Sequence, residues 1–223
     1  MIDLDGTVFN FPLAERRAFM ALCEEFNIDF SEDKYLFYEK ANKKRWQQYE
    51  MGLLKKEDIL LLRFKDFLDE YHIDLDCKEP AKRYMDLLPE NSIPFEGMKD
   101  FLYDIKKRYE VAAVTNGGTY PQKKKLKLNN MEDCFHHLFI SEEIGFPKPK
   151  QEFFDAVFSY YKDVPRENFL LIGDSLTSDI KGANLSGIKS LWLSFGNEPD
   201  SYAEPDYIVK SPGDLYSFLK EEI

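Results

Sequence analysis

The sequence predicts an α/β protein, with a Rossmann-like parallel sheet core and an inserted all-helical domain. After residue 95, short apolar runs alternate with amphipathic helical segments, which is the pattern of a doubly wound parallel sheet. Between residues 13 and 88, apolar residues instead recur at spacings of three and four, with no strand-like alternation. A first apolar strand and turn, residues 1–8, precede this helical stretch. The helices are therefore expected as an insertion into the core.

The domain boundaries follow from where these patterns change. Pro12 lies at one end of the helical stretch and Pro89 at the other. We expect a core made of residues 1–11 and 91–223, and a helical domain made of residues 12–90. The expected elements of the core after that domain are helix 96–108, strand 110–114, helix 121–129, strand 138–140, helix 150–161, strand 168–172, helix 177–186 and strand 189–193.

Composition and charge argue against several classes of partner. The formal net charge of −11 disfavours binding to a nucleic-acid polymer or to an anionic membrane. No apolar stretch approaches the ~20 residues that span a bilayer, and no basic-then-apolar leader is seen, so a cytoplasmic protein is expected. The three cysteines match no zinc or disulfide spacing. A small phosphorylated substrate stays compatible with the charge, because one cation and one lysine can set the local field.

Polar side chains stand at the ends of three apolar runs. These runs end in Asp3 and Asp5, in Thr115, and in Asp174 with Asp179. Because parallel strands present functional residues at their carboxyl ends, the five side chains are expected in one crevice. Clustered carboxylates repel one another unless a cation lies among them, and oxygen ligands favour Mg²⁺, which usually also needs a phosphate. The sequence therefore suggests a magnesium site that handles phosphate.

The first of these motifs carries two carboxylates with different possible tasks. Asp3 and Asp5 point the same way on an extended strand, and Gly6 allows a sharp turn after them. One carboxylate can attack phosphorus and become an aspartyl phosphate. The other can protonate the leaving alkoxide and later deprotonate water. Taken alone, Asp-Gly-Thr is a common turn with an exposed Asp5, so the argument depends on the other motifs.

Two further segments offer groups for an anion. Thr115 precedes Asn116 and two glycines, where a hydroxyl and successive backbone N–H groups can form an anion nest; an ordinary strand-to-helix turn explains the pattern as well. Lys148 lies between Pro147 and Pro149. Its ammonium could neutralise the nucleophile and the transferring phosphoryl group, and the alternative is a solvated surface lysine.

The third strand end suits a metal. Asp174 ends the most apolar strand and is a candidate for direct Mg²⁺ ligation. Asp179 comes one helical turn later and suits an indirect role, holding water or Lys148. It equally suits a first-turn acid favoured by the helix dipole.

One basic run is given no functional role. Lys123, Lys124, Lys125 and Lys127 lie on a predicted helix whose Leu126 points inward. The run is interpreted as a solvent-facing surface.

Taken together, these motifs resemble the haloacid dehalogenase superfamily of phosphotransferases. They occur in the family's order: Asp-x-Asp-Gly-Thr, Thr-Asn, Lys-Pro and Gly-Asp-x-x-x-x-Asp. The resemblance covers nearly the whole chain and implies Asp3 as the nucleophile and Asp5 as the general acid/base. It implies that Thr115 and Lys148 bind phosphate and stabilise charge. It also implies that Mg²⁺ is held by Asp174, Asp3 and the main-chain carbonyl of Asp5.

The resemblance also bears on activity and substrate. Dehalogenases lack an acid at the position of Asp5, because a halide leaving group needs no proton, so this carboxylate favours phosphate-ester chemistry. The helical insertion corresponds to a type 1 cap. Within it, Arg45-Trp-Gln-Gln-Tyr49 is similar to the YjjG-type pyrimidine 5'-nucleotidases. A nucleoside monophosphate is therefore the expected substrate class.

Three residues are expected to contact that substrate beside Thr115 and Lys148. Asn116 would do so from the core, and Arg45 and Trp46 from the cap. Core packing explains Trp46 as well, and a surface ion pair explains Arg45 as well.

The first strand departs from the family. Only Met1 and Ile2 precede Asp3, whereas the family's nucleophile ends a full strand. Ladder hydrogen bonds and buried apolar side chains would be lost. Either the start is truncated or the rest of the protein compensates.

The sequence thus favours a Mg²⁺-dependent phosphohydrolase with an aspartyl-phosphate intermediate, acting as a 5'-nucleotidase on pyrimidine nucleoside monophosphates. The alternatives are a sugar-phosphate phosphatase or phosphomutase on the same scaffold, and a catalytically impaired, non-enzymatic homologue.

Overall fold

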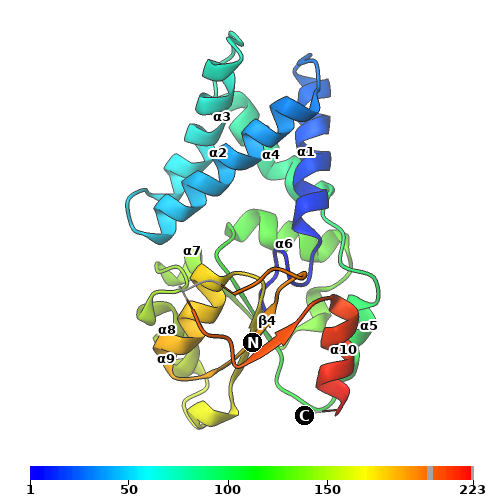
Figure 1. Ribbon diagram of the computed structural model, residues 1–223, viewed down its shortest axis with the longest axis vertical. Coiled ribbons are helices and arrows are strands. Elements are labelled where there is room, and N and C mark those ends of the chain that lie inside the picture. Colours follow the sequence, from blue (N-terminus) through cyan, green and yellow to red (C-terminus); the bar gives the residue numbers. More distant parts are fainter. Residues whose placement is uncertain (200–202, 222–223) are drawn as a thin grey trace. The chain divides into compact units, whose positions relative to one another are not determined.

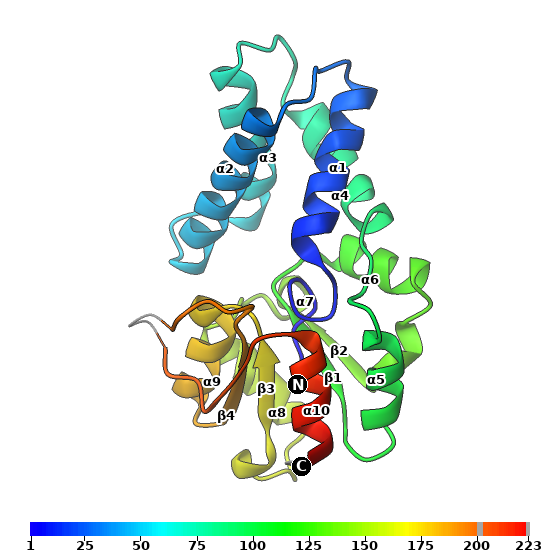
Figure 2. The same ribbon diagram turned by 45° about the vertical axis from the view of Figure 1, so that its right-hand side comes forward.

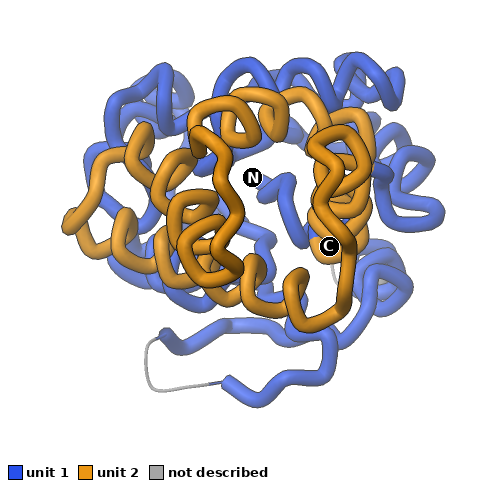
Figure 3. Tube along the Cα trace, turned by 90° about the horizontal axis from the view of Figure 1, so that it is seen from above, with its two compact units in different colours: residues 1–11, 93–223 blue, residues 12–92 orange. Residues whose placement is uncertain are grey.

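The computed structural model describes residues 1–199 and 203–221 (Figure 1). Two compact units account for them, Met1–Phe11 with Ile93–Ile223 in one and Pro12–Ser92 in the other (Figure 3). The first unit is built on parallel strands and the second on helices alone. The predicted fold class, a Rossmann-like parallel core with an inserted helical domain, is confirmed.

The strands of the first unit form two parallel ladders. Strand β1 (Ala112–Thr115) pairs with β2 (His137–Ile140), and β3 (Leu170–Gly173) pairs with β4 (Lys189–Leu193). Strand β5 (Tyr207–Val209) pairs with the far side of β4. All three pairings are parallel, as strand–helix alternation in the sequence predicts.

The start of the chain joins the two ladders. Ile2 bridges in parallel to Ala113 of β1 and to Ile172 of β3. The N–H of Ile2 donates to the carbonyl of Ala112 at 2.8 Å, and the N–H of Asp3 donates to that of Ile172 at 2.9 Å. The first strand is thus reduced to a short central stub, as expected, and it delivers Asp3 between β1 and β3.

Helices cover both faces of this sheet. Figure 2 shows α5 and α10 on one side and α8 and α9 on the other. One buried cluster contains Ile172 with side chains of α5 and α10, and another contains Leu171 with side chains of α8 and α9. Adjacent strand residues therefore serve opposite layers, as in a doubly wound sheet. The helical elements are α5 (Met98–Ile105), α6 (Thr119–Leu128), α7 (Ser141–Ile144), α8 (Gln151–Tyr160), α9 (Lys181–Ser186) and α10 (Pro212–Glu221), with 3₁₀ turns at Glu132–Cys134 and Arg166–Asn168 and a π-helical turn at Leu176–Ile180.

The second unit is a helical bundle with an aromatic core. Phe19 stacks on Tyr38 with ring centroids 4.7 Å apart, and Phe67 meets Phe19 edge-on at 5.1 Å. No strand occurs between residues 13 and 88, all of which are described. Its helices are α1 (Phe11–Glu25), α2 (Glu32–Glu50), α3 (Lys56–Glu70) and α4 (Lys78–Glu90).

The structure differs from the sequence expectation at several elements. Helix α7, strand β5 and helix α10 were not expected. The four residues of α7 and the three of β5 are too few to show a period. The expected helix 177–186 is instead a π-helical turn followed by α9. Such turns often lie at functional sites, and this one places Asp179.

Among the described residues, no helix is both long and apolar enough to cross a membrane.

Candidate active site

A tight turn follows the first strand and shapes the site. The N–H of Gly6 donates to the carbonyl of Phe9 at 2.9 Å, which closes the turn. Gly6 has a φ of +92°, and a Cβ there would lie 2.3 Å from a carboxylate oxygen of Asp174. Only glycine accepts this φ without strain and leaves the room. The turn from Asp3 can therefore pass directly against the end of β3.

Three carboxylates meet at this point. Oxygens of Asp3, Asp174 and Asp179 all lie within 4.8 Å of one another. Asp3 and Asp179 are buried, and Asp174 is half-buried. The Oδ2 atom of Asp3 is buried and has no hydrogen-bond partner among the described residues. A buried carboxylate oxygen is rarely left without a partner, so this atom is suited to an external ligand.

The crowding changes the protonation of the acids. Burial raises the pKa of Asp3 to about 7, and the charges of Asp179 and Asp5 add to that effect while Lys148 opposes it. Burial likewise raises the pKa of Asp174 well above its usual value, with further contributions from Asp3 and Asp179. Without a cation, the cluster therefore resists carrying its full negative charge.

Lys148 lies at the centre of the buried charges. Its Nζ donates to Oδ1 of Asp3 at 2.7 Å, to Oδ1 of Asp179 at 2.6 Å and to the carbonyl of Val114 at 2.8 Å. The residue is 1% exposed, so it is not a solvated surface lysine. Burial lowers the pKa of Lys148, but the charges of Asp179 and Asp3 more than offset this and hold it above its usual value. The ammonium is therefore a permanent cation beside Asp3.

The turn after β1 fastens the segment that carries Lys148. The side-chain oxygen of Asn116 accepts from the N–H of Lys148 at 2.8 Å, and its Nδ2 donates to the carbonyl of Lys148 at 2.9 Å. The Asn116 amide, which we expected to contact substrate, is thus engaged with the main chain. Thr115 is buried, and its Oγ1 accepts from the N–H of Gly117 at 3.0 Å. The hydroxyl proton of Thr115 remains available to donate to an anion.

Asp174 and Asp179 accept hydrogen bonds from several neighbours, of which the sequence had suggested only Lys148. Thr7 Oγ1 donates to Oδ1 of Asp174 at 3.1 Å, and Trp192 Nε1 donates to the carbonyl of Asp174 at 2.8 Å. Asp179 accepts from the N–H of Ser175 at 3.2 Å as well as from Lys148. The Asp-Gly-Thr motif, which contains Thr7, could have indicated that residue. No sequence pattern indicates Trp192, because its contact joins residues of two different strand segments.

Asp5 lies close to Asp3 in sequence but has separate partners. Gln122 Nε2 donates to Oδ2 of Asp5 at 2.6 Å, and the ammonium of Lys125 donates to Oδ1. Both partners are on α6, and both are buried. The prediction that the lysines from Lys123 to Lys127 all face solvent is therefore wrong for Lys125.

Arg45 and Trp46 lie in the other compact unit. Arg45 donates to both carboxylate oxygens of Asp66, at 2.6–2.9 Å, and to Gln48 at 3.0 Å. The ion pair that the sequence left open is thus present. Trp46 is half-buried and meets Tyr49 edge-on with ring centroids 5.8 Å apart. A substrate role for either residue stays a prediction.

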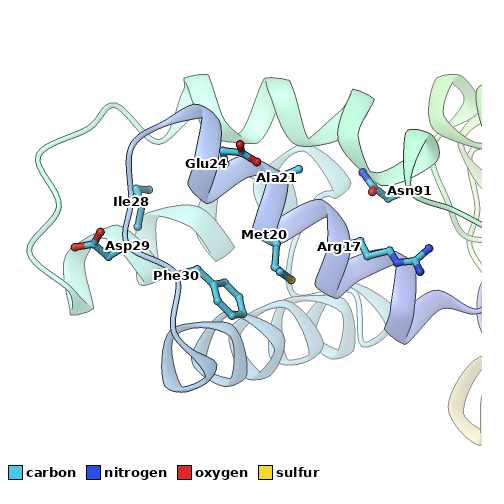
Figure 4. Close-up of a pocket in the computed structure, with 8 residues that line it drawn as sticks. All are labelled: Arg17, Met20, Ala21, Glu24, Ile28, Asp29, Phe30 and Asn91. Atoms are coloured by element: carbon cyan, nitrogen blue, oxygen red, sulfur yellow. The ribbon is translucent and has the colours of Figure 1, made fainter.

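A separate groove of about 480 Å³ lies on the helical unit (Figure 4). It contains none of the predicted site residues. Its lining is Arg17, Met20, Ala21, Glu24, Ile28, Asp29, Phe30 and Asn91.

The carboxylate cluster fits a hard divalent cation. It offers oxygen atoms alone, carries more negative charge than Lys148 balances, and includes the unpartnered Oδ2 of Asp3. Mg²⁺ prefers such oxygen donors and is commonly held by one or two carboxylates. Asp3 and Asp174 are the two acids best placed for it, because Asp179 already accepts from Lys148 and Ser175.

Comparisons with known proteins show the family of the chain. A family model described as haloacid dehalogenase-like hydrolase matches residues 1–193. Across its whole length the chain is 31% identical to the HAD-hydrolase YfnB of Bacillus subtilis (strain 168), covering 95% of that protein. It is 30% identical, again over its whole length, to the pyrimidine 5'-nucleotidase PynA of Streptococcus pneumoniae, covering 95% of it. Over 97% of the chain it is 27% identical to the pyrimidine 5'-nucleotidase YjjG of Escherichia coli (strain K12), covering 95% of it.

A solved structure extends the comparison to three dimensions. The crystal structure of YfnB bound to magnesium matches this chain with a TM-score of 0.92 at 30% identity. The match covers 98% of this chain and 96% of that one.

Proposed function

Because this chain belongs to the haloacid dehalogenase-like hydrolases, we propose that it is a Mg²⁺-dependent phosphatase with an aspartyl-phosphate intermediate on Asp3. The observation that carries the proposal is the cluster of Asp3, Asp174 and Asp179, two of which pair with the buried Lys148. A nucleophile, a permanent cation and a set of oxygen ligands are thus gathered in one place. Catalysis of phosphoryl transfer rests mostly on positioning and on electrostatic stabilisation, which these groups can supply.

In the first half-reaction, a carboxylate oxygen of Asp3 forms a bond to phosphorus while the bond to the leaving oxygen breaks. Asp5 donates the proton that the leaving alkoxide requires. Lys148 holds Oδ1 of Asp3 and offsets the charge that develops on the phosphoryl oxygens. The Thr115 hydroxyl offers a donor to the same oxygens, while its own oxygen accepts from the N–H of Gly117.

In the second half-reaction, Asp5 accepts a proton from the water that attacks phosphorus, and Asp3 is released as a carboxylate. Bound Mg²⁺, held by Asp3, Asp174 and the main-chain carbonyl of Asp5, would neutralise phosphate and carboxylate charge. Asn116 keeps Lys148 in place through its main chain. Asp179 accepts a second hydrogen bond from the Lys148 ammonium and helps to orient it.

The proposed substrates are pyrimidine nucleoside monophosphates, and the proposed activity is that of a 5'-nucleotidase. PynA and YjjG, both similar along nearly the whole chain, are named pyrimidine 5'-nucleotidases. We assign residues 12–90 the role of a cap that sets specificity, with Arg45 and Trp46 as its substrate-facing candidates. Every phosphate-handling residue named above lies outside that range.

The test is phosphate release across uridine, cytidine, thymidine and adenosine monophosphates, several sugar phosphates, and nitrophenyl phosphate. Each is measured with Mg²⁺, with a chelator, and with Asp3→Asn as the control. We expect Mg²⁺-dependent release that is fastest for the pyrimidine nucleotides. Faster release from sugar phosphates would reject pyrimidine nucleotides as the preferred substrates but would still support phosphatase activity. No release from any ester would reject the proposed function.

A further inference from the structure

Helix α6 presents two polar side chains to Asp5. Gln122 and Lys125 are three residues apart, so they lie on the same face of the helix. Gln122 Nε2 donates to Oδ2 of Asp5 at 2.6 Å, while the Lys125 ammonium donates to Oδ1. Each carboxylate oxygen therefore has its own donor. Two donors on two oxygens fix both the position of the carboxylate and the rotation of its plane.

The donors are buried, whereas the group that they hold faces outward. Gln122 and Lys125 are each 3% exposed, and the side chain of Asp5 is 27% exposed. Lys123 and Lys127 on the same helix are exposed, and Lys123 pairs with Glu143 at the surface. Burying an ammonium is unfavourable unless it is paired. The burial of Lys125 therefore requires an explanation, whereas the exposed Lys123 and Lys127 require none.

Neighbouring residues accommodate Lys125 and Gln122 in their contacts with Asp5. The Lys125 ammonium lies 4.8 Å from the ring centroid of Phe9, a fully buried side chain, in cation–π geometry. A Cβ on Gly117 would lie 1.7 Å from Gln122 Nε2. The turn that follows Thr115 therefore leaves the space through which Gln122 reaches Asp5.

We propose that Gln122 and Lys125 are positioning residues that hold the Asp5 carboxylate where it exchanges a proton with the leaving oxygen and with water. The inference rests on the proposed phosphatase function and assigns α6 a task within it. General acid/base transfer requires hydrogen-bond reach, and a displacement of about 1 Å can lower a rate by about 10²-fold. Neither residue touches the phosphoryl group in this scheme, since both act through Asp5.

The experiment is a kinetic double-mutant cycle with Lys125→Met and Asp5→Asn, using uridine monophosphate and nitrophenyl phosphate. Lys125→Met should lower kcat for the nucleotide by roughly 10- to 100-fold with little change in KM. The loss should be clearly smaller for nitrophenyl phosphate, since that leaving group needs little protonation. In the Asp5→Asn background, Lys125→Met should cause no further loss. Lys125→Arg should recover part of the rate, and Lys127→Met, on the exposed face of α6, should match the wild type.

Equal losses on both substrates, or losses that add to those of Asp5→Asn, would overturn the proposal and assign Lys125 a structural role. Gln122→Leu keeps the lysine and provides the same comparison if Lys125→Met does not fold.

A stability cycle separates this inference from the proposed function. The unfolding free energies of Asp5→Asn, Lys125→Met and the double variant should be non-additive, whether or not any ester is hydrolysed. Additive values would reject the contact itself. An inactive wild type with a non-additive cycle would reject the phosphatase and, with it, the catalytic role of the contact.

Discussion

Both compact units bury charged side chains, but they compensate those charges in different ways. In the core, Lys148 pairs with two of three clustered carboxylates, and one oxygen of Asp3 lacks a hydrogen-bond partner among the described residues. In the helical unit, one acid and one base are joined through an amide. Asn42 donates to Glu15 at 2.6 Å and accepts from Arg63 at 3.0 Å.

The helical network contains one acid and one base and is enclosed, although Nε of Arg63 has no hydrogen-bond partner among the described residues. Glu15, Asn42 and Arg63 are each 3% exposed. The guanidinium of Arg63 lies 4.6 Å from the ring centroid of Tyr84, which is also buried. The core cluster has surplus negative charge and therefore suits an external cation, whereas the helical network needs none. We infer that the first arrangement serves chemistry and the second serves the stability of its bundle.

The largest expected effect is on the core nucleophile. Asp3→Asn should lower turnover by on the order of 10⁴-fold or more, because it removes the atom that attacks phosphorus. The fold should persist, since burial already disfavours the charged form of Asp3. Steady-state kinetics and thermal unfolding measure the two effects. An unchanged rate would refute the covalent mechanism.

Removing the base of the helical network should destabilise the protein without touching the core site. Arg63→Met leaves the buried Oδ1 of Asn42 without its donor, and we expect a loss of about 1–3 kcal/mol in unfolding free energy. Denaturant titration provides the value. Arg83→Met is the matched control, because Arg83 pairs with Glu25 in a partly exposed position and should contribute less than about 1 kcal/mol. Equal losses in the two variants would contradict the contrast between buried and exposed pairs.

The acid of the same network should make stability depend on pH. Burial raises the pKa of Glu15 from 4.5 to about 7, against the opposing effects of Asn42 and Arg63. Because the folded state holds this proton more tightly than the unfolded state, the contribution is fully present below pH 4.5 and is lost as the pH rises through about 7. The loss should total about 3 kcal/mol.

The measurement compares wild type with Glu15→Gln across pH 4 to 8. The stability of the wild type relative to the variant should fall with rising pH. A flat difference would show that Glu15 titrates alike in the folded and unfolded states.

Mg²⁺ should stabilise the core cluster. At a concentration of about 100 times its Kd, a ligand that binds only the folded state adds about 2.7 kcal/mol. Asp174→Asn should abolish most of this gain, while Asp206→Asn, whose acid pairs with Lys189 elsewhere on the unit, should keep it. Thermal unfolding with and without Mg²⁺ measures the difference. A full gain in Asp174→Asn would remove that residue from the proposed ligands.

The smallest expected effect concerns specificity. Trp46→Ala should change the ratio of kcat/KM between uridine and adenosine monophosphates by about tenfold, with less change for nitrophenyl phosphate. Lys148→Ala should depress all three substrates alike, because Lys148 acts on the phosphoryl group. If Trp46→Ala also lowers all three equally, then Trp46 serves the packing of its helix rather than recognition.

Much of the fold was predictable because its signals are local. The period of three and four predicts the bundle, and short apolar runs between helices predict the parallel sheet. Asp3, Asp174 and Asp179 could be assigned to one place because parallel strands end at the same edge of a sheet. The Lys-Pro motif allowed Lys148 to be predicted as a site residue. Only the structure shows that it is buried between two of these acids.

The remaining features depend on which neighbours pack against a given face, and only the tertiary structure decides that. Lys125 looks like Lys123 and Lys127 in the sequence, yet it alone of the three is buried, because the turn carrying Asp5 lies against its side of α6. The pairing of Arg45 with Asp66 likewise joins positions on two helices that no local pattern links. The spacing of apolar residues thus predicts the helices and strands, and it places the polar residues that follow the strands at one edge of the sheet. Which charged side chains pair with one another depends on segments far apart in the sequence, so only the tertiary structure shows it.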